Sequence, residues 1–246
     1  MASVDQLWPP QARPADLAAL YDYPPDLAAP YVRVNFVSSL DGAVTLANRS
    51  RGLSDPADRD VFALQRTMAD VILVGAGTAR AEGYRGMRPT DGQATTRAAL
   101  GLAPVPPIAV VTASCWLTPE HPLVTDTLVP PIVVTVERAP AEHRAALADA
   151  GVPVLVAGPD RVDAAEAVRL LGERGLNRLL CEGGPHLFAD LVDADLVDEL
   201  CLTISPQLVG GAAGRITAGA AERSHGLRLA SVVHDESTLL LRYHRS

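Results

Sequence analysis

Residues 181–187 hold the residue types in this chain that best suit the binding of a phosphorylated ligand. The acid Glu182 follows an apolar run, and Gly183, Gly184 and Pro185 come next. Two glycines allow a sharp turn with exposed amides, and proline suits the first position of a helix, where no N–H needs a partner. An acid at the carboxyl end of a buried strand is costly unless it binds something. We therefore expect a functional turn here rather than an ordinary connection.

The same turn offers backbone donors for an anion. The amides of Gly184, His186 and Leu187 would face outward at the positive end of the following helix. A favourable anion contact at such a place contributes about 0.3 to 1 kcal/mol. A pyrophosphate suits this turn. The alternative is an ordinary turn without a ligand, followed by a helix whose first residue is Pro185.

A second glycine turn follows the apolar run that ends at Val74. Gly75 and Gly77 would let a ligand approach the backbone, and Thr78 stands where a helix is expected to begin. The spacing matches a dinucleotide-binding fingerprint only weakly. Arg80 occupies the third glycine position, and the next ~25 residues do not continue as a helix and a strand ending in an acid. A tight strand-to-helix turn without a ligand is an equally good interpretation.

A third polar group ends the first predicted strand. Ser38, Ser39 and Asp41 follow an apolar run, and Gly42 comes next. Ligands in open α/β sheets bind at the carboxyl ends of strands, which favours a functional role for Asp41. Asp-Gly is also a good turn pair, so a structural role fits equally well. Arg66 is isolated on a predicted helix and has the pattern of a surface residue.

Several enzyme classes lack their motifs in this sequence. G-x-S-x-G is missing, the six histidines form no H-x-x-x-H or H-E-x-x-H pair, and a P-loop is impossible without lysine. The zinc deaminase pattern of H-x-E with P-C-x-x-C is missing as well. We therefore set aside serine hydrolases, metallohydrolases and P-loop enzymes, and we predict no metal site.

Composition limits the partners. The net charge is −8, and all 21 basic side chains among the 246 residues are arginines. Nucleic acid and anionic membranes are therefore poor candidates, and an anionic group on a small-molecule substrate must be held by arginine or by backbone amides. Three widely spaced cysteines indicate neither a disulfide framework nor a zinc site. With no basic leader and no apolar run of about 18 residues, we expect a cytoplasmic protein without a membrane segment.

Short β-branched runs alternate with helical patterns from Tyr31 onward, which is typical of an α/β domain. The predicted strands are Val32 to Ser38, Val71 to Gly75, Ile108 to Thr112, Pro131 to Val136, Val152 to Val156, Arg178 to Cys181, Glu199 to Ser205 and Thr238 to His244. The predicted helices are Pro56 to Met68, Ala141 to Ala150, Ala164 to Arg174 and Pro185 to Val192. We expect an extended, proline-rich arm over residues 1–30 and one domain over residues 31–246. The stretch from Gly83 to Pro107 is predicted to be a long loop.

These segments, in this order and spacing, resemble the reductase domain of bacterial riboflavin biosynthesis, the C-terminal half of bifunctional deaminase-reductases. The resemblance covers roughly Tyr31 to His244. The stretches that carry it are Ser39-Leu40-Asp41-Gly42, the run from Ala69 to Thr78, the run from Cys181 to Leu187, and the run from Leu196 to Gly211. With Tyr21-Asp22-Tyr23-Pro24 included, the chain is most similar to stand-alone actinobacterial proteins of the pyrimidine reductase family.

The resemblance implies a three-layer, dihydrofolate-reductase-like α/β fold, in which a mostly parallel mixed sheet is flanked by helices. It also implies a homodimer and an NADPH cofactor at the carboxyl edge of that sheet. The expected cofactor-binding residues are Gly75, Gly77, Thr78, Glu82, Thr112, Gly183, Gly184, Pro185, His186 and Leu187. Thr112 would meet the adenosine 2′-phosphate together with Ser114. An ordinary strand end is an equal alternative there, and Arg80 is another candidate for that contact.

Family positions that match Ser50, Arg66 and Glu182 face a ribosylaminouracil phosphate, whose ribosyl carbon receives the hydride. On this basis Glu182 would bind uracil N–H groups, and Arg66 would pair with a phosphate or carboxylate. Asp41 would orient a hydroxyl or assist protonation. Asp41 and Glu182 are the predicted catalytic residues.

The chain departs from the family at Ala43, where many members carry lysine or arginine. One phosphate-facing charge is therefore missing, and Arg49, Arg51, Arg85 and Arg88 are the candidates to replace it. The leading hypothesis is a 5-amino-6-(5-phosphoribosylamino)uracil reductase of riboflavin biosynthesis that lacks its own deaminase. A reductase of dihydrofolate or another pteridine, and a non-catalytic NADPH-binding dimer, are the alternatives.

Overall fold

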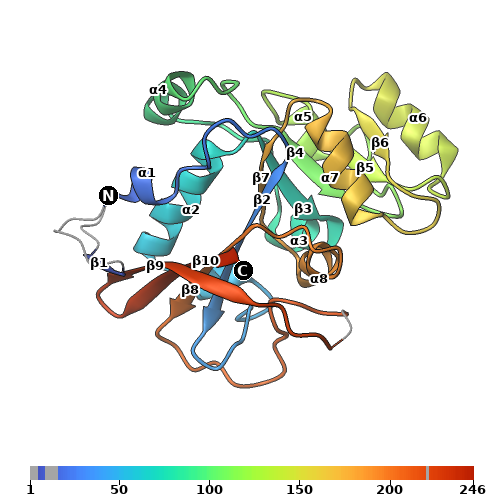
Figure 1. Ribbon diagram of the computed structural model, residues 1–246. Helices are drawn as coiled ribbons and strands as arrows, with labels where there is room; N and C mark the ends of the chain where they lie inside the picture. Colours follow the sequence, from blue (N-terminus) through green and yellow to red (C-terminus); the bar gives the residue numbers. More distant parts are fainter. Residues whose placement is uncertain (1–4, 9–15, 220–221) are drawn as a thin grey trace.

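The computed structural model describes residues 5–8, 16–219 and 222–246 (Figure 1). The strands are β1 (Asp5–Trp8), β2 (Tyr31–Ser39), β3 (Val71–Gly75), β4 (Ile108–Val111), β5 (Ile132–Thr135), β6 (Val154–Val156), β7 (Arg178–Cys181), β8 (Glu199–Ser205), β9 (Leu227–Asp235) and β10 (Thr238–Arg245). The α-helices are α1 (Leu17–Leu20), α2 (Pro56–Met68), α3 (Ala76–Glu82), α4 (Asp91–Ala99), α5 (Pro122–Thr125), α6 (Ala141–Asp149), α7 (Ala164–Gly172) and α8 (Pro185–Asp193). A 3-10 turn, η1, spans Ser50–Gly52.

The ten described strands form one sheet in the order β1-β9-β10-β8-β2-β7-β3-β4-β5-β6. The pairings from β8 across to β6 are parallel. The pairings among β1, β9, β10 and β8 are antiparallel. The prediction of a mixed, mostly parallel sheet flanked by helices is confirmed.

The parallel part of the sheet is covered on both faces, which explains its continuous apolar runs. On β3, Leu73 packs into a cluster with α7 and α8, while Ile72 and Val74 pack into a second cluster with α3, α5 and α6. A third cluster joins α1 and α2 to β8, β9 and β10 through residues such as Val61 and Val233. The sheet therefore forms the middle of three layers.

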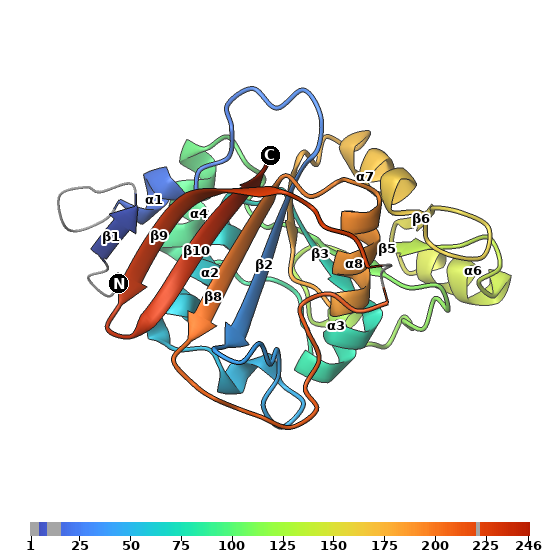
Figure 2. The same cartoon turned by 60° about the horizontal axis from the view of Figure 1, so that its bottom comes forward.

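The antiparallel part is covered on one face only. In Figure 2, β8, β10 and β9 are seen from the side opposite α1 and α2, and no helix crosses them there. Along this face Leu241 stands between Leu202 on β8 and Val232 on β9, and Leu239 pairs with Ile204 in the next row. These side chains are half-buried, so the open face is largely apolar.

One prediction about irregular structure was wrong. The stretch from Gly83 to Pro107 contains α4, which begins with a capping box between Thr90 and Gln93. The buried Arg97 holds this helix to the end of α2, because its guanidinium donates to the Thr67 carbonyl oxygen at 2.9 Å and to the Ala69 carbonyl oxygen at 2.7 Å. Neither the cap nor these contacts require apolar residues at helical spacing, so the sequence pattern did not indicate this helix.

The predicted arm over residues 1–30 is described in part, and residues 1–4 and 9–15 lie outside the described residues. It contributes β1 at the edge of the sheet and the short helix α1, so it is not wholly extended. Tyr21 and Tyr23 are buried in the third cluster. β9 was also missed by the sequence analysis. In the part of the chain that the structure describes, no helix is long and apolar enough to cross a membrane.

Candidate active site

The two predicted glycine turns meet at the carboxyl edge of the sheet. β7 and β3 are neighbours in parallel register, so the turns that follow them lie side by side. The Gly75 amide donates a hydrogen bond to the Gly183 carbonyl oxygen at 2.7 Å. Segments more than a hundred residues apart in sequence therefore form one composite backbone surface.

Two helices start at this surface without a side-chain cap. α3 has Gly75 as its N-cap and α8 has Gly184, and neither cap position can offer a side-chain acceptor to the first-turn amides. Gly77 and His186, in the two first turns, are exposed. Uncapped N–H groups at the positive ends of two neighbouring helices make a site for an anion. A pyrophosphate fits this arrangement.

Close packing explains why glycine occupies the turn after β7. Gly183 has φ +90°, and a Cβ atom there would lie 3.0 Å from the Phe36 ring. A Cβ atom on Gly184 would lie 2.4 Å from the Thr78 hydroxyl oxygen. The peptide bond between the two glycines is cis. By contrast, a Cβ atom on Gly77 would meet no atom within 4 Å, so the backbone there borders open space.

Glu182, directly before this turn, is fully engaged by two protein side chains. The Arg66 guanidinium donates to both carboxylate oxygens, at 2.6 and 2.7 Å. The Tyr84 hydroxyl donates to Oε2 at 2.5 Å. The Glu182 side chain is 1% exposed, whereas Arg66 is 23% exposed. We call these three residues the Arg66-Glu182-Tyr84 unit. Its arginine, and not its acid, reaches solvent.

The charges within this unit are fixed by their surroundings. Burial acts to lower the pKa of Arg66, but the Glu182 carboxylate outweighs it and holds that pKa above its usual range. Burial, with the nearby Glu182 carboxylate, raises the pKa of Tyr84 well above its ordinary value. The guanidinium also lies 4.3 Å from the centre of the Phe62 ring. Both Arg66 and Tyr84 therefore act as hydrogen-bond donors at neutral pH.

A pocket of about 530 Å³ opens in front of the unit. It is lined by Arg66, Tyr84, Ser50 and Glu82, with the Ser50 amide donating to Glu82 Oε1 at 2.8 Å. Glu182 is not part of this lining. Further lining residues are Phe62, Ala63, Gly83, Arg85, Gly86, Met87, Arg88 and Gln93. The predicted substrate residues Ser50 and Arg66 thus lie together. Glu82, predicted for the cofactor, lies with them on the pocket side.

Asp41 stands apart from this pocket lining and is held by three donors. It accepts hydrogen bonds from the Ser39 hydroxyl, from the Gly210 amide at 2.7 Å and from the Val209 amide at 3.2 Å. The Ser39 hydroxyl and these two amides lower the pKa of Asp41 to about 2. The carboxylate is therefore ionised at neutral pH, and the geometry favours a structural role over proton donation.

Thr112 follows β4 at the same edge of the sheet. It is buried, and its hydroxyl lies 3.4 Å from the Ser114 hydroxyl. Arg80, on α3, places its guanidinium 4.9 Å from the centre of the Trp116 ring. Thr112 with Ser114, and Arg80, are therefore both still candidates for the contact with the adenosine 2′-phosphate.

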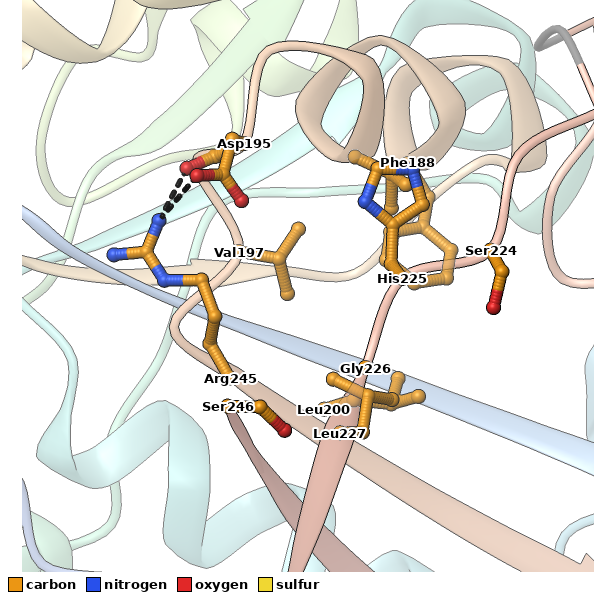
Figure 3. A pocket seen from close by; sticks show the side chains of 11 residues that line it. Phe188, Asp195, Val197, Leu200, Ser224, His225, Gly226, Leu227, Arg245 and Ser246 are labelled. Carbon is orange, nitrogen blue, oxygen red and sulfur yellow. Dashed lines mark hydrogen bonds and ion pairs between the residues drawn. The ribbon is translucent and has the colours of Figure 1, made fainter.

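A second pocket, of about 310 Å³, lies at the opposite edge of the sheet. Figure 3 shows Phe188 of α8, Val197 and Leu200 around it, with Arg245 paired to Asp195 at 3.3 Å on its rim. Because Leu200 is near the amino end of β8, this pocket lies toward the amino ends of the parallel strands, whereas the glycine turns follow their carboxyl ends. Neither residues 183–187 nor the Arg66-Glu182-Tyr84 unit contributes to its lining.

Sequence reasoning missed Tyr84, which lies within the stretch predicted to be a loop. The local pattern around Arg66 is that of a surface residue, and only the family resemblance indicated Arg66 as a substrate residue. Their partner Glu182 is 98 and 116 residues away, respectively. No local signal marks such a contact. The one hint in the sequence was Glu182 itself, because a buried acid at the end of a strand needs hydrogen-bond donors.

Comparison with known proteins identifies the family. Residues 30–241 match the family model described as the RibD C-terminal domain. The 2,5-diamino-6-ribosylamino-4(3H)-pyrimidinone 5′-phosphate reductase of Methanothermobacter thermautotrophicus is 34% identical over 183 residues, covering 74% of this chain and 80% of that enzyme. The enzyme of the same name from Aquifex aeolicus is 31% identical over 187 residues, covering 74% and 79%.

A solved structure shares this fold. A pyrimidine reductase-like protein from Corynebacterium diphtheriae superposes with a TM-score of 0.77 at 25% identity, covering 88% of this chain and 92% of that chain. The match of the family model spans β2 through the first half of β10 and includes both glycine turns and the Arg66-Glu182-Tyr84 unit. This chain therefore belongs to the RibD C-terminal domain family.

Proposed function

We propose that this chain is an NADPH-dependent reductase of a ribosylaminopyrimidine 5′-phosphate in riboflavin biosynthesis. One observation carries the proposal. Glu182 holds Arg66 and Tyr84, which line the 530 Å³ pocket, and the residues directly after Glu182 form the turn that we propose binds an anion. A substrate in the pocket and a dinucleotide at the turn would therefore share a border, which is the arrangement that hydride transfer requires.

The residues present suit the cofactor. The paired helix starts of α3 and α8 would hold its pyrophosphate through backbone amides, and Thr78 supports the turn at Gly184. In a chain without lysine, backbone donors and arginine are the means of binding such a group. When bound, NADPH would supply the hydride. The choice of NADPH over NADH would depend on Thr112, Ser114 or Arg80.

The proposed reaction opens the ribosyl ring of the substrate. Reduction breaks the bond between ribosyl C1′ and the ring oxygen, adds a hydride to C1′ and delivers one proton to that oxygen, which becomes a hydroxyl. The protein must hold the sugar in line and exclude water. Arg66 and Tyr84 present fixed donors to the pocket. Arg66 would therefore orient a substrate oxygen, and Glu182 would act by holding Arg66 and Tyr84 in place.

The relatives suggest which pyrimidine ring is bound. Three relatives that are 34%, 30% and 31% identical to this chain are named for the 2,5-diamino-pyrimidinone. The leading hypothesis from the sequence was the corresponding uracil, which differs at ring position 2. We propose the diamino ring as the preferred substrate and the uracil as the second candidate of the same reaction.

The test is the oxidation of NADPH, measured by its absorbance, in the presence of each of three compounds. We expect turnover with the diamino-pyrimidinone phosphate, slower turnover with the uracil phosphate, and none with dihydrofolate. NADH should be the poorer reductant. Turnover of dihydrofolate alone would contradict the proposal in favour of a pteridine reductase. NADPH binding without turnover of any compound would indicate a non-catalytic protein.

We further propose that the chain forms a homodimer through the open face of β8, β10 and β9. The half-buried row of Leu202, Leu241 and Val232 is uncharged, and a contiguous apolar face of this kind is unusual on a monomer. We expect the protein to sediment as a dimer and Leu241→Glu to sediment as a monomer. Leu128→Glu, at a residue that is 57% exposed elsewhere, is the control. A monomeric wild type would contradict the proposal.

A cytoplasmic location is the last part of the proposal. Cys115, Cys181 and Cys201 are free and buried, and thiols kept in this state suit a reducing compartment. Mapping of disulfide bonds in protein isolated without reductant tests this point, and we expect all three cysteines to be free thiols. A disulfide between any two of them would contradict it.

A further inference from the structure

Residues 206–219, which follow β8, contain no helix or strand, yet both ends of this stretch are held by hydrogen bonds. We call residues 206–219 the strap. Figure 2 shows this stretch leaving the end of β8, passing below the end of β2 and turning up beside α8. It therefore runs along the carboxyl edge of the sheet, where the glycine turns and the pocket lie. Most of its side chains are exposed, with Leu208 at 80%.

Asp41 makes the first fastening. Its carboxylate accepts the Gly210 amide at 2.7 Å and the Val209 amide at 3.2 Å. The Ser39 hydroxyl donates to the same carboxylate, while its oxygen accepts the Ala43 amide at 2.9 Å. The turn at the end of β2 thus presents a carboxylate of fixed orientation to two backbone amides of the strap.

Further bonds join the strap to the same loop. The Leu40 amide donates to the Gln207 carbonyl oxygen at 2.9 Å. The Gln207 side chain donates to the Gly52 carbonyl oxygen at 3.2 Å. Gly52 ends η1, the turn that starts with Ser50 at the pocket. The near end of the strap and the wall of the pocket are therefore parts of one hydrogen-bonded network.

The far end of the strap contacts the cofactor turn. The Ala218 amide donates to the Pro185 carbonyl oxygen at 3.1 Å. A Cβ atom on Gly219 would lie 3.0 Å from Nδ1 of His186. Ile216 packs against the cluster that contains Leu187. The strap therefore spans the distance between the end of β2 and the first turn of α8.

We propose that Asp41 is a positioning residue, which fastens the strap as one wall of the cleft where the cofactor and the ribosyl carbon meet. This inference deepens the proposed function and rests on it. A carboxylate suits the task because it accepts several backbone N–H bonds at once, and such charge-assisted bonds are about twice as strong as neutral ones. Gly210 and Gly211 have φ +65° and +71°, so the strap at this point depends on glycine and on the acceptor that faces it.

The role differs from that of a proton donor. A carboxylate held by three donors is an acceptor, and it acts on the reaction through the strap instead of through a substrate atom. Removing it should loosen the strap and admit water beside the transferred hydride. Loss of a catalytic acid would instead remove one limb of the pH profile of kcat. The two roles can therefore be separated.

The test compares Asp41→Asn with Asp160→Asn, which changes a carboxylate that is 68% exposed and lies 3.7 Å from Arg138. Hydrogen–deuterium exchange of the unliganded full-length chain reports on the strap directly. We expect amides of residues 207–210 to exchange about tenfold faster in Asp41→Asn, because two charge-assisted bonds are lost. Asp160→Asn should exchange like the wild type. Ser39→Ala, which leaves the carboxylate in place, should give a smaller increase.

Activity supplies the second measurement. We expect kcat of Asp41→Asn to fall by about ten- to a hundredfold, a range that one to two lost hydrogen bonds can produce, with the shape of its pH profile unchanged. Unchanged exchange in residues 207–210 would overturn the inference, and so would loss of one limb of the pH profile. If the wild type fails to reduce any pyrimidine while Asp41→Asn still loosens the strap, the proposed function fails and the fastening by Asp41 stands.

Discussion

Glu182→Gln is expected to destabilise the fold as well as the site. The substitution keeps the shape of the side chain but removes the charge that two Arg66 nitrogens bind at 2.6 and 2.7 Å. It also brings an amide donor against these donors. Removing one partner of a fully buried pair costs about 3 to 5 kcal/mol. Arg66 is 23% exposed and regains some hydration, so we expect about 2 to 3 kcal/mol.

Thermal unfolding is the appropriate measurement. For a chain of this size each kcal/mol shifts the melting temperature by roughly 2 to 4 °C, which gives a fall of about 4 to 12 °C for Glu182→Gln. The control is Asp190→Asn. Asp190 pairs with Arg161 at 3.0 Å, but Arg161 is 83% exposed, and a surface pair contributes about 0 to 1 kcal/mol.

A specific result would refute this reasoning. If Glu182→Gln melted within about 1 °C of Asp190→Asn, far less than a buried pair should give, the Arg66-Glu182-Tyr84 unit would not be a tightly bound element. The same variant tests the site. Unchanged kcat/KM for the true substrate would remove any role of Glu182 in holding Arg66 and Tyr84 for binding.

Three further outcomes are expected. Tyr84→Phe removes the hydroxyl that donates to Glu182 at 2.5 Å and should cost about 1 to 2 kcal/mol in urea unfolding, with less than additive loss when combined with Glu182→Gln. For Glu199, burial raises the pKa, but two flanking arginines outweigh it and hold that pKa at about 2, below its ordinary 4.5. Its stabilising contribution is therefore complete above pH 4.5 and lost as the pH falls toward 2, so acid unfolding of Glu199→Gln should depend less on pH over that range. Gly183→Ala, at φ +90°, should weaken NADPH binding measured by calorimetry, and a smaller effect in Gly77→Ala is the control.

The elements that the sequence identified are those with a local cause. Pro56 to Met68 was placed correctly because Asp55 caps the helix and its apolar residues repeat on one face. β3 and β4 were recognised by continuous apolar runs, which follow from burial on both faces. α4 was missed because eight of its nine residues are intermediate or exposed, so its packing leaves no period. The distant contacts of Arg97 that hold it have no local signal.

The same division holds within the candidate site. The turn from Gly183 to Leu187 was predictable because glycine conformation and helix-end electrostatics are properties of a few consecutive residues. The partner of Glu182 was not, because it depends on how α2 and the loop after α3 pack against β7. A buried acid must have hydrogen-bond donors, but the residues next to it in the sequence do not indicate which side chains donate.

Glu182 and Asp41 both form hydrogen bonds with other groups of the protein, and this limits how they can bind a ligand. Glu182 is closed off by Arg66 and Tyr84, whereas the exposed Asp41 carboxylate is held by the Ser39 hydroxyl and two backbone amides of the strap. At the Arg66-Glu182-Tyr84 unit, recognition therefore falls to donors. Arg66 is a fixed donor because its carboxylate partner is 1% exposed and cannot be exchanged for a ligand at low cost.

The other arginines of the pocket are held in a different way. Arg85 and Arg88 are 67% and 57% exposed, and both pair with the single carboxylate of Asp126. Exposed pairs of this kind contribute little to stability and are screened by salt, and one carboxylate shared by two guanidinium groups leaves positive charge in excess. Of the arginines proposed to replace the charge missing at Ala43, these two line the pocket. A substrate phosphate could exchange with Asp126 there at small cost, whereas displacing Glu182 from Arg66 would leave a buried carboxylate without its counterion.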